Sequence, residues 1–171
     1  MMHYNLGYVL IINIYLKKQG GIQMDSIVKY QEKYLDDIIT LFINVFKEEP
    51  WNDNWFSNKQ AGKYLLDIIN IPGFEGYLYI SNDEVIAGLF GHLIRWWEGD
   101  EYFIKEFFVD PDFQGDGIGS KMMDKLNKEL KKNNINTIVL LTDLHSPAAD
   151  FYKKRGFTEK SDLKFMYKNI D

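Results

Sequence analysis

The stretch VDPDFQGDGIGSKMM, residues 109–123, is the most informative part of the sequence for predicting the fold. It places Gly115, Gly117 and Gly119 within five residues, after an apolar run and before a segment with helical spacing. Glycine lets the backbone approach a ligand closely, and the first N–H groups of a helix have no intrahelical acceptor, so they can bind an anion. The stretch therefore predicts either a phosphate-binding turn or a tight strand-to-helix turn whose glycines serve packing alone.

Neither of the two common phosphate-binding loops fits this stretch. A Walker A loop requires G-x-x-x-x-G-K-S/T, but here Gly119 is followed by Ser120 and only then by Lys121. A dinucleotide loop requires G-x-G-x-x-G and an acid about 20 residues further on. Here Ser120 stands where that loop has its last glycine, and residues 135–140 read INTIVL, without an acid. Both classes are excluded.

The runs on both sides of the stretch predict helices and strands in alternation. Apolar residues at helical spacing predict helices over residues 34–47, 58–71 and 118–132. A short fourth helix is expected after Ser146, which can cap it, with Pro147 at its first position and Gly156 at its end.

Strands are predicted by alternating or continuous apolar runs. These runs cover residues 26–31, 73–81, 84–97, 101–109, 135–142 and 163–169, and another short strand is expected near Phe157. Asn82 and Asp83 predict a hairpin turn, and the run at 135–142 is typical of a strand buried on both faces. The order of elements favours an α/β architecture around one sheet.

Composition narrows the classes of function. The 171 residues suit one domain, and 46% apolar and 16% aromatic residues indicate a packed globular protein. The absence of cysteine excludes disulfides, thiolate metal sites and a cysteinyl acyl-enzyme, and three scattered histidines offer no metal-ligand spacing. We therefore expect no metal. A formal charge of −5 argues against nucleic-acid binding and leaves room for a cationic partner.

Residues 1–23 differ from the rest of the chain. An apolar run of about a dozen residues precedes Lys17 and Lys18, which is too short to span a bilayer and lacks the layout of a signal peptide. We interpret residues 1–23 as an extension outside the fold and 24–171 as the domain, with an interfacial anchor or an extra strand as alternatives. Residues 24–171 carry 18 basic and 25 acidic side chains, a formal charge of −7. We expect a cytoplasmic protein without a membrane partner.

Two motifs resemble those of the GNAT superfamily of acyl-CoA-dependent N-acetyltransferases. The opening stretch is similar to its motif A, Q/R-x-x-G-x-G/A, with Gln114, Gly117 and Gly119 in the fixed positions. Downstream, PAADFYKKRGF resembles its signature A-x-x-F/L-Y-x-x-x-G-F, through Ala148, Phe151, Tyr152, Gly156 and Phe157. The order of elements also matches, so the resemblance covers residues 24–171. It implies a mixed, mostly antiparallel central sheet, splayed between its fourth and fifth strands and flanked by about four helices.

The resemblance implies that acetyl-CoA is the cosubstrate. Its pyrophosphate would be bound by the backbone N–H groups of the turn, and its pantetheine arm and acetyl carbonyl by the preceding strand. His145 stands where relatives often carry an asparagine that contacts the cofactor, so it either makes that contact or merely flanks a helix. The expected binding residues are Phe108, Val109, Gln114, Gly115, Asp116, Gly117, Ile118, Gly119, Ser120, His145 and Tyr152.

The catalytic residues implied by the resemblance are Tyr152 and Glu106. Tyr152 matches the tyrosine assigned as general acid near the thioester sulfur; the alternative is an aromatic packing residue. FIKEFFV resembles the YLEDFFV run of small-amine acetyltransferases, but the position of the proposed base holds Lys105. Glu106 matches the second acid, and a strand carboxylate beside a partly apolar cleft can have a raised pKa. Alternatively, Glu106 binds substrate or faces solvent. Alternation places Glu101 on the opposite face.

Tryptophans and acids in two loops suggest the acceptor. Trp51, Trp55, Trp96 and Glu106 are the expected substrate-binding residues, and Trp97, Glu48, Glu49, Glu98 and Asp100 can complete an aromatic and acidic wall. Core tryptophans with solvated acids would give the same sequence.

We therefore expect an N-acetyltransferase that moves acetyl from acetyl-CoA to a small cationic amine, such as a polyamine, a diamine or an aminoglycoside, by direct attack in a ternary complex. Acetylation of a protein N-terminus or lysine is one alternative, and a non-catalytic acyl-CoA-binding regulator is another. The sequence leaves a homodimer open.

Overall fold

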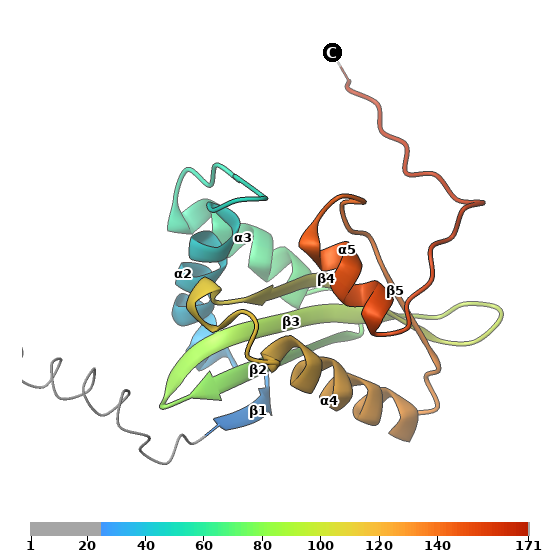
Figure 1. Ribbon diagram of the computed structural model, residues 1–171, viewed down its shortest axis with the longest axis horizontal. Helices are drawn as coiled ribbons and strands as arrows, with labels where there is room; N and C mark the ends of the chain where they lie inside the picture. The colour runs from blue at the N-terminus through green and yellow to red at the C-terminus, as the bar shows by residue number, and fades with distance from the viewer. Residues whose placement is uncertain (1–24, 171) are drawn as a thin grey trace, which may run out of the picture. The chain divides into compact units, whose positions relative to one another are not determined.

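The computed structural model describes residues 25–170, in which the chain divides into two compact units, the first ending at Val139 and the second beginning at Leu140. The expectations for residues 1–23 lie outside this part of the chain. The first unit contains most of the sheet and three α-helices, and the second contains one short helix (Figure 1). None of the helices within residues 25–170 is long and apolar enough to span a bilayer.

The sheet has five strands in the order of the sequence. They are β1 (Asp25–Lys29), β2 (Phe74–Ser81), β3 (Glu84–Ile94), β4 (Glu101–Val109) and β5 (Thr137–Leu140). The first four pair antiparallel with their neighbours, and β5 follows β4 in parallel orientation. The helices are α2 (Leu35–Phe46), α3 (Asn58–Ile69), α4 (Ile118–Lys132) and α5 (Pro147–Lys154), with short 3-10 helices at Glu32–Tyr34 and Pro111–Phe113. The predicted mixed α/β architecture is confirmed.

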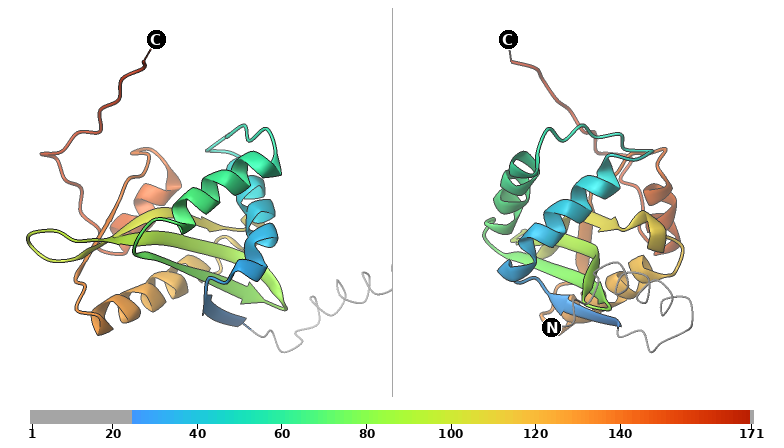
Figure 2. Two further views of the ribbon diagram at one scale, coloured as in Figure 1. Left: turned by 180° about the vertical axis from the view of Figure 1, so that it is seen from behind. Right: turned by 90° about the vertical axis from the view of Figure 1, so that its left-hand side faces the viewer.

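Helices α2 and α3 cover one face of the sheet, and α4 lies on the other (Figure 2). The α2–α3 side holds a continuous apolar core, in which Phe42 and Leu65 from the helices meet Leu78, Phe90 and Phe108 from the strands. All five side chains are at most 2% exposed. Because each strand alternates its side chains between the two faces, this core fixes which strand residues point toward α2 and α3.

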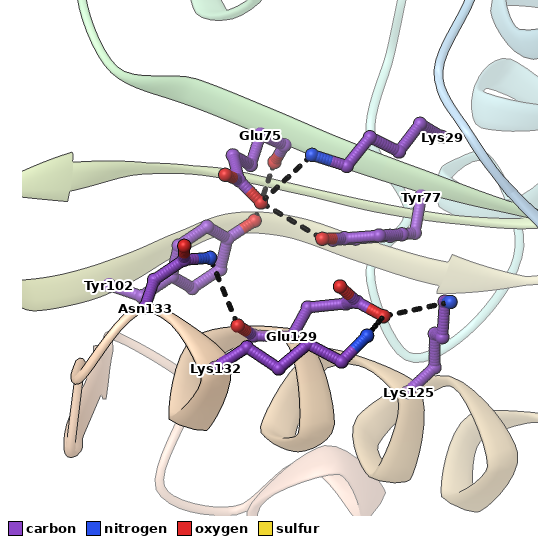
Figure 3. Close-up of polar contacts among 8 residues, drawn as sticks. All are labelled: Lys29, Glu75, Tyr77, Tyr102, Lys125, Glu129, Lys132 and Asn133. Atoms are coloured by element: carbon purple, nitrogen blue, oxygen red, sulfur yellow. Dashed lines mark hydrogen bonds and ion pairs between the residues drawn. The ribbon is translucent and has the colours of Figure 1, made fainter.

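Two groups of polar side chains are found on this second face, one on α4 and one on the strands (Figure 3). On α4, Glu129 accepts hydrogen bonds from Lys125 and Lys132 at 3.0 and 2.9 Å, which hold the pKa of its carboxyl at about 2. On the sheet, the Tyr77 hydroxyl donates to the Glu75 carboxylate at 2.9 Å, and the Tyr102 hydroxyl donates to the Glu75 carbonyl at 2.6 Å. The polar side chains of each group thus satisfy one another, within the helix on one side and within the sheet on the other.

Several local predictions are confirmed. Asn82 and Asp83 both have positive φ, 49° and 65°, as a two-residue hairpin turn between β2 and β3 requires. The predicted bounds of α4 and β4 are those of the structure. The Ser146 side chain caps α5 by accepting a hydrogen bond from the Ala149 N–H, and Gly156 follows the helix with φ of 87°.

Three strand predictions are wrong. The described residues after α5 form no strand, so neither the short strand near Phe157 nor the one at 163–169 is present. The apolar side chains of the latter, such as Phe165 and Tyr167, are 77% and 81% exposed. Alternating apolar and polar residues give a segment one apolar and one polar face, but a strand also needs a neighbouring strand to which its backbone can hydrogen-bond. The prediction that β5 is buried on both faces is also wrong: Thr137 is exposed and the other residues are half-buried.

Candidate active site

The glycine-rich turn leads from β4 into α4 and has the backbone conformation that its sequence predicts. Gly115 and Gly117 have φ of 92° and 77°, a region that side-chain-bearing residues rarely adopt. No atom lies within 4 Å of a Cβ added at either position. Packing therefore does not explain these two glycines, whereas the required backbone conformation does.

The turn leaves the N-terminus of α4 without a side-chain cap. Gly117 is the N-cap residue, and the first helical hydrogen bond runs from the Lys121 N–H to the Gly117 carbonyl. The N–H groups of residues 118–120 precede that bond, where the helix dipole favours an anion. Before the turn, the Gln114 side chain links the turn to the end of β4, because its Nε2 donates to the Val109 carbonyl at 3.0 Å.

Phe108 and Val109, at the end of β4, have different surroundings. The Phe108 side chain is 2% exposed and packs in the core against Phe42, with ring centroids 5.6 Å apart. Val109 is half-buried. A contact of Phe108 with a cofactor would therefore be made by its backbone.

Glu106 lies on the α2–α3 face of β4, and a β-bulge directs it there. Phe90 and Gly91 are consecutive on β3, but they pair with Glu106 and Ile104, so that Lys105 is an extra residue on β4. The bulge interrupts the alternation on which the opposite placement of Glu101 and Glu106 depended. That prediction is wrong, because the extra residue brings the two positions back to one face.

The Glu106 side chain is half-buried, and its carboxylate is hydrogen-bonded to Tyr64 of α3. The Tyr64 hydroxyl donates to Oε1 of Glu106. Burial raises the pKa of the Glu106 carboxyl to about 7; the hydrogen bond from Tyr64 and the charge of Lys105 oppose the rise, and the charge of Asp53 adds to it. A carboxyl with this pKa can exchange a proton near neutral pH.

Tyr64 is itself held as a neutral donor. Burial raises the pKa of its hydroxyl well above the ordinary value, and the negative charge of Glu106 raises it further. The ring lies between Trp55 and Phe42, with centroid distances of 5.3 and 5.8 Å. The hydroxyl thus approaches Glu106 from a side chain that is packed on its flanks.

Tyr64 belongs to a group of packed aromatic rings. We call Phe42, Phe46, Trp51, Trp55, Tyr64 and Phe108 the aromatic cluster; neighbouring ring centroids lie 4.6 to 6.2 Å apart. Within the described residues, the buried indole nitrogen of Trp55 has no hydrogen-bond partner. The structure therefore brings together three of the four predicted substrate-binding residues: Trp51, Trp55 and Glu106.

Trp96 lies apart from the aromatic cluster in the described structure. It follows the end of β3, in a turn closed by the hydrogen bond from the Gly99 N–H to its carbonyl. Its side chain is 52% exposed, and that of Trp97 81%. The predicted acids nearby also face solvent or pair locally: Asp100 accepts from Arg95 at 3.1 Å. The wall that joined both loops is not seen as predicted.

Tyr152 and His145 belong to the second unit. Tyr152 is nearly buried on α5, and its ring lies 5.3 Å from those of both Phe151 and Phe157. The His145 N–H donates to the Asp143 carboxylate at 2.7 Å, in the turn before the helix. Within residues 25–170, no group of three or more metal-ligating side chains is placed to hold an ion.

Tyr64 is the residue that sequence analysis missed. On α3 it adjoins the buried face formed by Ala61, Leu65 and Ile68, so its spacing indicates only an amphipathic helix. Nothing in that spacing points to a carboxylate 42 positions away on a strand.

Comparison with known protein families finds a match to the acetyltransferase (GNAT) family over residues 35–157. An uncharacterized N-acetyltransferase of Methanocaldococcus jannaschii is 40% identical over 135 residues, 76% of this chain and 59% of that protein. The ribosomal protein bS18-alanine N-acetyltransferase of Escherichia coli K12 is 25% identical over 123 residues, 71% of this chain and 74% of that enzyme. The match thus spans less than two thirds of the archaeal relative.

Solved structures show the same fold. An aminoglycoside acetyltransferase from an uncultured soil metagenomic sample, in complex with sisomicin, has a TM-score of 0.68 over 86% of this chain and 97% of its own, at 19% identity. A predicted acetyltransferase of Clostridium acetobutylicum with acetyl-CoA has a TM-score of 0.64 over 84% and 96%, at 21% identity. At these identities, the likeness concerns the fold alone.

Proposed function

The chain belongs to the acetyltransferase (GNAT) family, and from this premise we propose that it transfers acetyl from acetyl-CoA to a primary amine of a small cationic molecule. Polyamines, diamines and aminoglycosides are the proposed acceptors. The observation that carries the proposal is Glu106, a half-buried carboxylate that is hydrogen-bonded to Tyr64 and whose pKa is raised by burial to about 7.

The donor site proposed is the glycine-rich turn with the start of α4. Members of this family use acetyl-CoA, whose pyrophosphate carries the negative charge that an uncapped helix N-terminus favours. The positive φ angles of Gly115 and Gly117 turn the backbone without a side chain in the way. We assign the pyrophosphate to the N–H groups of residues 115–120, because the Gln114 N–H donates to the Pro111 carbonyl at 3.3 Å. We assign the acetyl end to the backbone of Phe108 and Val109.

Glu106 is the proposed general base. A primary amine is mostly protonated at neutral pH and must lose a proton before its nitrogen can attack the acetyl carbonyl. Glu106 takes that proton, directly or through water. As the new C–N bond forms and the C–S bond breaks, the departing thiolate takes a proton, which we assign to the Tyr152 hydroxyl from the resemblance of its motif. The second proton that the nitrogen loses on becoming an amide then returns to the Tyr152 phenolate.

The surroundings of Glu106 favour a cationic acceptor. Asp53 adds negative charge, and among residues 25–170 the cation that acts on the carboxyl is Lys105, whose ammonium lies over the Phe103 ring at 5.1 Å. Aromatic faces attract cations as well. The likeness to an aminoglycoside acetyltransferase adds that class to the acceptors worth testing.

A protein N-terminus is the second candidate acceptor. Its support is the Escherichia coli relative that acetylates an N-terminal alanine of ribosomal protein bS18, at 25% identity over 71% of this chain. Such an acceptor would need room for a peptide beside the aromatic cluster.

The proposal is tested by measuring the thiol released from acetyl-CoA in the presence of one acceptor at a time. The acceptors are spermidine, putrescine, kanamycin and a peptide with an N-terminal alanine. We expect turnover with the cationic small molecules, and a loss of about 10²–10⁴-fold in kcat for Glu106→Gln. Preferred turnover of the peptide would favour the second candidate. Binding of acetyl-CoA with no turnover of any acceptor would instead indicate a regulator.

A further inference from the structure

We propose that Tyr64 is a positioning residue of the acetyl transfer: its hydroxyl fixes the orientation of the Glu106 carboxylate by binding Oε1, which leaves Oε2 to take the proton of the amine. The inference rests on the proposed role of Glu106 as the base. It assigns distinct tasks to the two carboxylate oxygens.

The first support is the rigidity of the donor. Helix α3 is capped by Ser57, whose side chain accepts from the Gln60 N–H at 3.2 Å. Its buried face, with Leu65 at 0% exposure, anchors the helix in the core. The Tyr64 ring is then flanked by Trp55 and Phe42. A hydroxyl held by a packed ring on a docked helix presents one geometry to its acceptor.

The second support is the distribution of charge around the carboxylate. Three groups from three segments act on Glu106: Tyr64 from α3, Asp53 from the segment between α2 and α3, and Lys105 on β4 itself. Tyr64 is the one that donates a hydrogen bond to the carboxylate. A hydrogen bond to the charged form favours that form. Tyr64 therefore opposes the effect of burial and keeps more of the base ready at neutral pH.

The pKa of Glu106 can be measured without any substrate. The full chain is labelled with glutamate carrying ¹³C at the side-chain carboxyl, and its resonances are titrated from pH 5 to 9; Glu106 is the resonance that Glu106→Gln removes. Tyr64→Phe keeps the ring and deletes the hydroxyl, so the titration midpoint of Glu106 should rise by about one pH unit, a tenfold change in proton affinity.

Two variants serve as controls. Tyr30→Phe deletes a hydroxyl from a tyrosine packed on the same core, against Phe74 and Phe90, and should leave the midpoint unchanged. Asp53→Asn removes a charge that raises the pKa of Glu106 and should move the midpoint down. An unchanged or lower midpoint in Tyr64→Phe would overturn the proposal.

Kinetics separate this inference from the proposed function. With acetyl-CoA and spermidine, kanamycin or the alanine-terminated peptide, the acid limb of kcat/KM for Tyr64→Phe should move to higher pH, with about tenfold lower activity at pH 6 and recovery toward pH 9. In the Glu106→Gln background, Tyr64→Phe should have no further effect. If Glu106→Gln retains full activity, the base assignment itself is wrong. If Glu106→Gln is inactive but Tyr64→Phe keeps the wild-type profile, only the positioning role fails.

Discussion

Replacing Glu106 with glutamine should stabilise the folded protein at pH 8 far more than at pH 5. The pKa of this carboxyl rises from 4.5 to about 7 on folding, chiefly because of burial. Between those values the folded state binds the proton more tightly than the unfolded state, so stability falls as the pH rises through this window. Above pH 7, the folded protein holds a buried negative charge that glutamine does not carry.

The size of the effect follows from the same interval. About 2.5 pH units at 1.36 kcal/mol each give an upper limit of about 3 kcal/mol, most of which falls between pH 5 and pH 8. Glutamine keeps an oxygen that can accept from the Tyr64 hydroxyl, so the comparison isolates the charge.

Urea unfolding of the wild type and Glu106→Gln at pH 5 and pH 8 measures this difference. Glu98→Gln, in the exposed turn after β3, removes the same charge from solvent and serves as the control. The reasoning is refuted if the difference between the wild type and Glu106→Gln is the same at both pH values, or if it reverses.

Three further changes test the other parts of the site. Gly117→Ala should destabilise the fold by about 1–2 kcal/mol because of its φ of 77°, and should weaken acetyl-CoA binding in calorimetry, whereas Gly119→Ala, inside α4, should not lower the melting temperature. Tyr152→Phe should lower kcat and leave the KM for acetyl-CoA nearly unchanged; full turnover would remove it from the acid role. Trp55→Phe should raise the KM of a cationic acceptor, and Trp96→Phe, in an exposed turn, should not.

The elements that the sequence predicts well are those whose signal is local. Helix α4 has its apolar spacing, its glycine entry and its basic end within Ile118–Lys132, and the turn at Asn82 and Asp83 depends on two residues. In both cases, the residues that cause the structure lie within the element itself, and both elements were predicted at the positions where the structure has them.

The last predicted strand shows the limit of such patterns. Residues 163–169 alternate as a strand does, yet a strand exists only where a neighbour supplies hydrogen bonds, and that partner is not encoded in the segment itself. The half-buried β5 shows a related limit, since burial of both faces depends on the elements that pack above and below the sheet, which the apolar run itself does not encode.

The candidate site was half predictable for a similar reason. Glu106 could be chosen from its motif, but its orientation depends on the bulge at Lys105, which is visible only in the register between β3 and β4. Tyr64 lies 42 positions away, on a helix whose spacing resembles that of any amphipathic helix. No local pattern in a single sequence indicates that two residues so far apart will pack against each other in the fold.

Burial raises the pKa of Glu106 toward the value that suits a base, but it also destabilises the folded protein once the carboxyl is ionised. The hydrogen bond from Tyr64 reduces both effects, because it lowers that pKa. Without the hydroxyl, burial and the charge of Asp53 would raise the pKa further, so less of the carboxylate would be ionised at neutral pH. If the ammonium of Lys105 lay beside the carboxylate on the α2–α3 face, the pKa of Glu106 would fall, and the base would be too weak to take a proton from an ammonium. A neutral donor such as the Tyr64 hydroxyl gives Glu106 a pKa between the value without a donor and the value beside a cation. A cationic acceptor would place a positive charge near the carboxylate only while it is bound.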